Sequence, residues 1–193
     1  MAKKRIHLLI IFLVVICLFQ TRKSILEYKK TTQEQVSIDY FFLKGQTKPL
    51  SIAKQTIPTE YYAVLEIPKI NLKQGLMAPD SPENDVDKHI YIVKESIFPV
   101  NNNLSHIILA AHSGYDCVAY FKNLNHLQSG DLVYLYYANH QYTYTVNSTY
   151  EIEKTGYLSY QTQNISDVYL ITCKKNTNKQ LVLIANLTNI TDY

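Results

Sequence analysis

The chain contains few of the features that mark several common classes of protein. Its 193 residues include only three cysteines, Cys17, Cys117 and Cys173. At most one pair of them can form a disulfide, and Cys17 lies in an apolar N-terminal run, so the chain is not a disulfide-stapled scaffold. The formal net charge is only +3, and the lysines are scattered without interleaved aromatic residues. No nucleic-acid partner is therefore expected.

Glycine is also scarce, with five residues, whereas tyrosine is abundant, with 17. Val, Ile, Leu and Thr fill short runs between polar segments. Because β-branched and aromatic residues are favoured in strands, this composition favours a β-rich core. The length suits one globular domain of ordinary size, with room for an appended anchor or stalk.

Only one apolar run is long, and it lies near the N-terminus. Ile6 to Thr21 carries no charge and lies between a basic cluster, Lys3 to Arg5, and the pair Arg22 and Lys23. As a helix this run would rise roughly 24 Å, slightly less than a hydrocarbon core of about 30 Å, and flanking basic side chains can bridge the gap. We expect an uncleaved membrane anchor, because no A-x-A-like cleavage site follows Phe19. A cleaved signal peptide is the alternative.

These features divide the chain into three predicted parts. Residues 1–23 are expected to form a single transmembrane helix in the cell membrane, and the body is expected to lie outside the cell, because the run sits where an export signal sits. Residues 24–58 are polar, with a helical pattern followed by Gly and Pro, and are expected to form a stalk and strap. Residues 59–193 form the predicted globular domain.

The body contains seven short runs that are typical of strands. They are Tyr61–Pro68, His89–Val93, Ser105–His112, Leu132–Tyr137, Gln141–Ile152, Val168–Cys173 and Gln180–Leu187. The runs "HIILAA" and "LVLIA" are continuously apolar, which indicates strands buried on both faces, whereas "QYTYTV" alternates. Their close spacing, with "AYFKNLNHL" as a short helix, predicts a mainly β fold, either a barrel or a sandwich.

Two residues capable of catalysis end two of these buried runs, His112 and Cys173. A residue at the end of a buried strand is held rigidly yet reaches the surface, which suits a catalytic group. A cysteine thiolate with an imidazole as acid and base performs nucleophilic catalysis. Taken singly, His112 equally fits a side chain bonded to a nearby carbonyl, and Cys173 fits a small buried apolar residue.

A metal site is a third interpretation of the same residues. His112, Cys117 and Cys173 supply three soft ligands, but their only close pair has the spacing H-x4-C. Zinc sites usually contain closer pairs such as C-x-x-C. The sequence therefore predicts neither a metal site nor a cofactor.

Three segments, in order, resemble the sortases, the cysteine transpeptidases of Gram-positive cell surfaces. They are "VLEIPKINLKQGL", "ILAAHSGYDCVAYFKNLNHLQSGDLVYLYY" and "YLITC" with a short loop and a last strand after it. The likeness runs from Tyr61 to about Leu187. It implies a closed eight-stranded sortase barrel with one or two short helices, and it puts His112 and Cys173 at the family's histidine and cysteine. A single N-terminal anchor looks like class A, D or E rather than class C, and the compact spacing between the two residues speaks against class B.

The resemblance also implies a reaction and its partners. Cys173 would attack a sorting motif of the LPxTG kind in a secreted surface protein, and an amine from a cell-wall precursor or a pilin would resolve the thioester. By analogy, the loop from Glu153 to Asp167 covers the apolar residue of the motif, which makes Leu158 and Ile165 candidate substrate-binding residues. Asp116 could orient His112, but its place in the sequence favours an ordinary surface-loop residue.

One departure from the family concerns arginine. The family carries an arginine on the last strand, yet the only arginines here are Arg5 and Arg22. Gln180 takes the arginine's place in the pattern, with Lys179 beside it as a candidate substrate contact. Gln supplies two neutral donors and Lys a mobile point charge, whereas Arg offers a fixed charged fork. The alternatives are therefore a membrane-tethered module that binds sorting signals without cleaving them, and a cysteine peptidase that releases its product to water.

Overall fold

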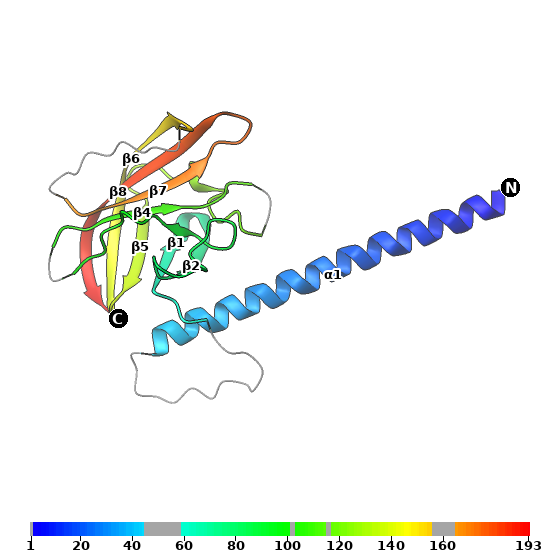
Figure 1. The fold of residues 1–193 in the computed structure, drawn as a ribbon, viewed down its shortest axis with the longest axis horizontal. Coiled ribbons are helices and arrows are strands. Elements are labelled where there is room, and N and C mark those ends of the chain that lie inside the picture. The colour runs from blue at the N-terminus through cyan, green and yellow to red at the C-terminus, as the bar shows by residue number, and fades with distance from the viewer. Residues whose placement is uncertain (1, 45–58, 101–102, 115–116, 156–164) are drawn as a thin grey trace.

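The computed structural model describes residues 2–44, 59–100, 103–114, 117–155 and 165–193. It consists of an eight-stranded, nearly closed β-barrel and one long helix that projects away from it (Figure 1). This confirms the mainly β barrel that the sequence and the resemblance predicted.

The N-terminal segment forms a single helix, α1, from Ala2 to Leu43. This helix combines the predicted anchor with most of the predicted stalk. Within the described residues, no helix combines the length and the apolar character needed to cross a membrane. The predicted single-pass membrane anchor, which also carried the membrane as a partner and the placement in the cell membrane, is therefore wrong. The physical reason is that the uncharged run of α1 rises only roughly 24 Å, less than a hydrocarbon core of about 30 Å.

The C-terminal part of α1 packs on the barrel. Ser37 and Ile38 are buried, with 0% and 2% of their surfaces exposed. Glu34 joins the two parts with both carboxylate oxygens, because Oε2 accepts the Tyr61 hydroxyl (2.7 Å) and Oε1 accepts the Gly75 N–H (3.1 Å). The helix is thus fixed to the start of the barrel by packing and by charge-assisted hydrogen bonds.

The strands follow the predicted runs with one addition. They are β1 (Ala63–Ile67), β2 (Leu72–Leu76), β3 (Tyr91–Ile92), β4 (His106–Ala110), β5 (Leu132–Tyr137), β6 (His140–Glu153), β7 (Asp167–Cys173) and β8 (Lys179–Asp192). The addition is β2, whose sequence "LKQGL" carries two polar residues and a glycine and so lacks the usual strand signal. Two short 3-10 helices, η1 (Pro68–Ile70) and η2 (Leu124–His126), complete the body. Of the helix predicted in "AYFKNLNHL", only η2 is helical.

The hydrogen-bonded order of the strands is β2-β1-β5-β6-β8-β7-β4-β3. β4 and β7 are parallel, whereas β8 pairs in antiparallel fashion with both β6 and β7. In the described part of the chain β2 and β3 stand at the two ends of this order and do not pair, which leaves the barrel nearly rather than fully closed.

The neighbouring strands β4 and β7 and the first half of β8 are covered on both faces. Alternate residues point into the barrel core, among them Leu109, Leu170 and Leu183. The residues between them form a second apolar cluster on the other face, which is composed of Ile108, Tyr169, Ile171 and Val182, with Val93, Ala110, Tyr150, Ile152 and Ile184 packed against it. We call this surface the outer face. The continuous apolar runs in the sequence are explained by this burial on both sides.

Candidate active site

His112 and Cys173 lie at the ends of two neighbouring strands: His112 follows β4 by two residues, and Cys173 is the last residue of β7. In the parallel pair of β4 and β7, Ala110 lies opposite Ile171, so each residue of β4 lies opposite the residue 61 positions later. The same offset separates His112 from Cys173. The register continues beyond β4, because the Ala111 N–H still donates to the Ile171 carbonyl (3.1 Å). Neighbouring strands lie about 4.8 Å apart, so this register puts the two side chains next to each other.

Both side chains belong to the outer face. Ala110 and Ile171 contribute to the outer-face cluster, and residues two positions further along a strand point the same way. His112 is 40% exposed, and Cys173 is partly buried. The thiol and the imidazole thus sit where an apolar surface meets solvent, which suits reaction with a peptide that lies along the outer face.

Hydrogen bonds on the opposite face hold the ends of these two strands together. The Thr172 hydroxyl donates to the Ala111 carbonyl (2.7 Å), and the Ser113 hydroxyl donates to the Cys173 carbonyl. The chain after His112 turns back, so that the Phe121 N–H donates to the His112 carbonyl (3.1 Å). These bonds fix the backbone on both sides of the two candidate catalytic residues.

Gln180 shares the outer face with Cys173. The two residues are direct partners in the antiparallel pair of β7 and β8, and directly opposed residues have Cβ atoms about 5 Å apart. Lys179 points to the other face, where its Nζ lies 3.9 Å from Glu151 Oε2. The Lys174 N–H next to Cys173 already donates to the Lys179 carbonyl (2.9 Å). The Gln180 amide is therefore a side-chain donor on the thiol's face, whereas Lys179 is not.

Asp87 is a polar neighbour of His112 that the sequence analysis missed. Its Oδ1 lies 2.8 Å from His112 Nε2, although it is 25 residues away in the sequence. Asp87 lies in the segment between β2 and β3, in the stretch "ENDVDKH", where nothing in the pattern distinguishes it from Asp85. The acidic residue considered for this role, Asp116, lies outside the described residues.

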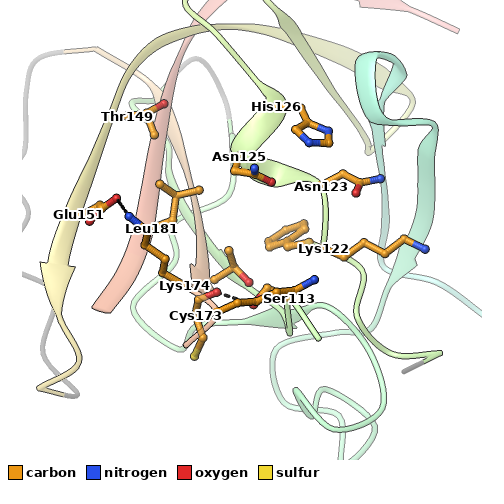
Figure 2. A pocket seen from close by; sticks show the side chains of 13 residues that line it. Ser113, Lys122, Asn123, Asn125, His126, Thr149, Glu151, Cys173, Lys174 and Leu181 are labelled. Carbon is orange, nitrogen blue, oxygen red and sulfur yellow. Dashed lines mark hydrogen bonds and ion pairs between the residues drawn. The ribbon is translucent and has the colours of Figure 1, made fainter. Parts of the chain in front are cut away.

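A cavity of about 630 Å³ lies beside the ends of β6, β7 and β8. Figure 2 shows its lining, and the sulfur of Cys173 points away from His126 and Asn125, which lie across the cavity. Lys174 pairs with Glu151 there, and this hydrogen bond lowers the pKa of the Glu151 carboxyl below its ordinary value. Cys173 therefore lies at the edge of the cavity, and its thiol points away from the cavity.

The two residues expected to bind the apolar part of a substrate have different outcomes. Leu158 lies outside the described residues. Ile165 is 44% exposed and lies two residues before the start of β7, whereas Cys173 is the last residue of this strand. Eight residues of strand span roughly 26 Å, which separates Ile165 widely from the thiol. The structure instead brings Ala110 and Ile171 of the outer face next to Cys173 and His112.

No group of three or more potential metal ligands occurs among the residues that the structure describes. Cys117 is exposed and lies beside α1, where its carbonyl accepts a hydrogen bond from Lys30 Nζ (3.5 Å).

Comparisons with known proteins give one family. Residues 65–188 match the sequence model of the Sortase domain. A comparison with curated protein sequences gave no match.

Solved structures with the same fold include several sortases. Sortase A of Listeria monocytogenes is 20% identical, with a TM-score of 0.58 over 70% of this chain and 92% of its own. Sortase C2 of pilus island 1 from Group B Streptococcus is 22% identical, with a TM-score of 0.60 over 75% and 83%. Sortase E1 from Streptomyces coelicolor, solved with a tripeptide in its active site, is 16% identical, with a TM-score of 0.59 over 68% and 90%. The sequence match covers more than half of the chain and the structural matches share its barrel, so the chain belongs to the sortase family.

Proposed function

We propose that the chain is a cysteine transpeptidase in which Cys173 is the nucleophile and His112 is the acid and base. The observation that carries this proposal is the shared register of β4 and β7, which gives the thiol and the imidazole one face at one strand end. The substrate is an extended peptide of a secreted surface protein with an LPxTG-like motif. The apolar outer face next to Cys173 suits the apolar side chains of such a peptide.

The proposed reaction has two halves. The Cys173 thiolate attacks the backbone carbonyl at the scissile bond, a thioester forms, and the C–N bond breaks as His112 gives its proton to the departing amine. The neutral imidazole then takes a proton from an incoming amine, whose nitrogen attacks the thioester carbonyl; the C–S bond breaks, and the Cys173 thiolate and the protonated His112 are restored. A new amide bond replaces the one that was broken, so no oxidant and no metal are needed. The acceptor amine comes from a cell-wall precursor or from a lysine of a pilin.

Gln180 has the third role in this proposal. An oxyanion forms on the attacked carbonyl, and a neutral amide donor on the same face as Cys173 can stabilise it. Arginine would supply a permanent charge at this point, whereas Gln180 supplies only a dipole. We therefore expect a slower acylation step than an arginine would give, but through the same geometry.

Mass spectrometry of the full chain tests this function. The protein is incubated with a library of sorting-signal peptides, with and without amines such as triglycine. We expect a mass increase at Cys173 that equals the N-terminal part of one peptide, and a ligated product when the amine is present. Cys173→Ala abolishes both signals, whereas the matched variant Cys117→Ala keeps most of the rate, because Cys117 lies on the α1 side of the body. Equal turnover by Cys173→Ala would refute the mechanism.

The lack of arginine after residue 22 favours one second candidate, a module that binds sorting signals without cleaving them. This candidate predicts that peptides bind equally well to the wild type and to Cys173→Ala, and that no adduct forms on Cys173. A third outcome, cleavage without ligation at any amine concentration, would indicate a peptidase that passes its thioester to water.

A further inference from the structure

We propose that Asp87 is a positioning residue that holds His112 in one tautomer, so that Nδ1 is the nitrogen that exchanges protons during the reaction. This inference rests on the proposed function of His112. It starts from the 2.8 Å contact between Asp87 Oδ1 and His112 Nε2. A carboxylate oxygen only accepts hydrogen bonds, so Nε2 must carry the hydrogen. In the neutral ring the lone pair then lies on Nδ1.

The side chain of Asp87 is 79% exposed. Its backbone is nevertheless held in place by hydrogen bonds within the turn that carries it. Its N–H donates to Asp85 Oδ1 (2.9 Å), and the next two N–H groups, of Lys88 and His89, both donate to the Asp85 carbonyl (3.0 and 2.8 Å). The Tyr120 hydroxyl donates to the Lys88 carbonyl (3.1 Å). The turn that carries Asp87 is therefore preorganised before it meets His112.

The same tyrosine connects this turn to the segment that carries the histidine. Tyr120 directly precedes Phe121, whose N–H donates to the His112 carbonyl. Both partners of the Asp87–His112 pair are therefore attached to one short stretch of chain. In an ion pair between two independent surface loops, the two loops would not be hydrogen-bonded to the same segment, as they are here through Tyr120 and Phe121. In catalytic triads a carboxylate likewise accepts a hydrogen bond from one ring nitrogen and so sets the tautomer and the orientation of the imidazole.

Asp87 also has a chemical purpose in the proposed reaction. The first half-reaction, which forms the thioester, needs a protonated His112 ring that can give a proton to the departing amine. The second half-reaction, which consumes the thioester, needs a neutral ring that can accept a proton from the incoming amine. A carboxylate that accepts the Nε2 hydrogen in both states of the ring leaves Nδ1 as the site of proton exchange. The Asp87 oxygen itself never touches the substrate, so it acts through His112.

The chain provides a matched control for this proposal. His140 and Asp192 form a second surface pair with a separation of 2.6 Å, and their side chains are 45% and 86% exposed, close to the 40% and 79% of His112 and Asp87. This pair bridges the start of β6 and the end of β8, away from Cys173. Asp192→Asn therefore removes an equally exposed partner of a histidine without touching the candidate site.

The experiment combines kinetics with NMR on the full chain. Asp87→Asn should lower kcat for peptide cleavage roughly 5-fold to 20-fold, since an exposed pair contributes little and a general acid contributes more, while KM changes less than about 2-fold. Asp87→Glu should restore part of kcat, and Asp192→Asn should leave both constants unchanged. In the wild type, the ring ¹⁵N shifts of His112 should report hydrogen on Nε2, and in Asp87→Asn they should report a mixture of the two tautomers.

Three results would overturn the inference. One is an unchanged kcat in Asp87→Asn, and another is hydrogen on Nδ1 of His112 in the wild type. The third is a higher kcat in Asp87→Asn, which would mean that Asp87 holds the imidazole away from the thiol. If the wild type forms no adduct on Cys173 at all, the proposed function fails. The NMR measurement then still decides whether Asp87 sets the tautomer.

Discussion

Gly75 in β2 is a position where a single methyl group should loosen the junction between α1 and the barrel. A Cβ built on Gly75 would lie 2.3 Å from two ring atoms of Tyr61 and 2.4 Å from a third. Real Cβ atoms essentially never come that close to another heavy atom. The φ angle of Gly75 lies outside the left-handed region, so Gly75→Ala would cause no backbone strain of its own. The whole effect should come from displacing the Tyr61 ring.

The expected cost has two parts. Overpacking a well-packed site costs about 1–3 kcal/mol. A displaced ring also loses the hydrogen bond from the Tyr61 hydroxyl to Glu34 Oε2, and hydrogen bonds to charged groups contribute about 1.5–3 kcal/mol. Gly75→Ala should therefore lower the free energy of unfolding by about 3 kcal/mol, a large share of the roughly 5–15 kcal/mol of a typical domain.

Urea unfolding measures this change, and the chain supplies two controls. Gly114→Ala adds the same methyl group where, among the described residues and apart from its chain neighbours, no heavy atom lies within 4 Å, so its effect should stay within about 0.5 kcal/mol. In a Tyr61→Ala background the ring is gone, so Gly75→Ala should cost less than about 1 kcal/mol. An equal cost of Gly75→Ala in both backgrounds would show that the clash with Tyr61 is not the cause.

Two further predictions concern the candidate site and the pH dependence of stability. Gln180→Ala should lower kcat/KM for the peptide that forms the adduct by about 10²-fold, the loss expected for one oxyanion donor. The control Lys179→Ala should change kcat/KM less than about 3-fold. A larger loss in Lys179→Ala than in Gln180→Ala would move the donor role to the other face of β8. Burial lowers the pKa of His89 below its ordinary value of 6.5. The unfolded chain therefore binds more protons than the folded chain just below that pH, so the free energy of unfolding should rise with pH up to about 6.5 and then level off. His89→Gln should flatten this rise in urea unfolding between about pH 5 and pH 7.5, and an unchanged slope would count against burial as its cause.

The strands were predictable from the sequence because their patterns follow directly from burial. The runs of β4 and β8 are continuously apolar since both of their faces are covered, and β5 begins and ends at the predicted residues. The sequence does not predict β2, because it has Gly75 where a strand would usually have a β-branched or aromatic residue. Glycine is needed there because the Tyr61 ring occupies the space that a side chain would fill. The membrane anchor was predicted from an uncharged run with basic flanks. Such a run is a local feature, and it does not decide whether a helix is long and apolar enough to span.

The candidate site was predictable only in part, for a similar reason. His112 and Cys173 each end an apolar run, so the sequence marks them, and the parallel register of β4 and β7 then brings them together. The family pattern marks Gln180, and the antiparallel register of β7 and β8 places it directly opposite Cys173. Asp87 had no such signal. It lies in a turn, and only the folded chain brings that turn to His112.

Successive residues of a strand point to opposite faces, and this alternation decides which charges lie near the thiol. It makes the Asp87–His112 pair more important when the neutral Gln180 stands in place of an arginine. Lys174 and Lys179, on either side of the β7–β8 turn, both face Glu151, so their positive charge is directed to the cavity side and not to the thiol. The outer face near Cys173 is otherwise apolar. With no arginine there, the proposed mechanism leaves the protonated His112 ring as the one positive charge beside the Gln180 dipole when the oxyanion develops. Asp87 is the carboxylate that contacts this ring, so the positioning role proposed for it should matter more here than in a site with a permanent guanidinium charge.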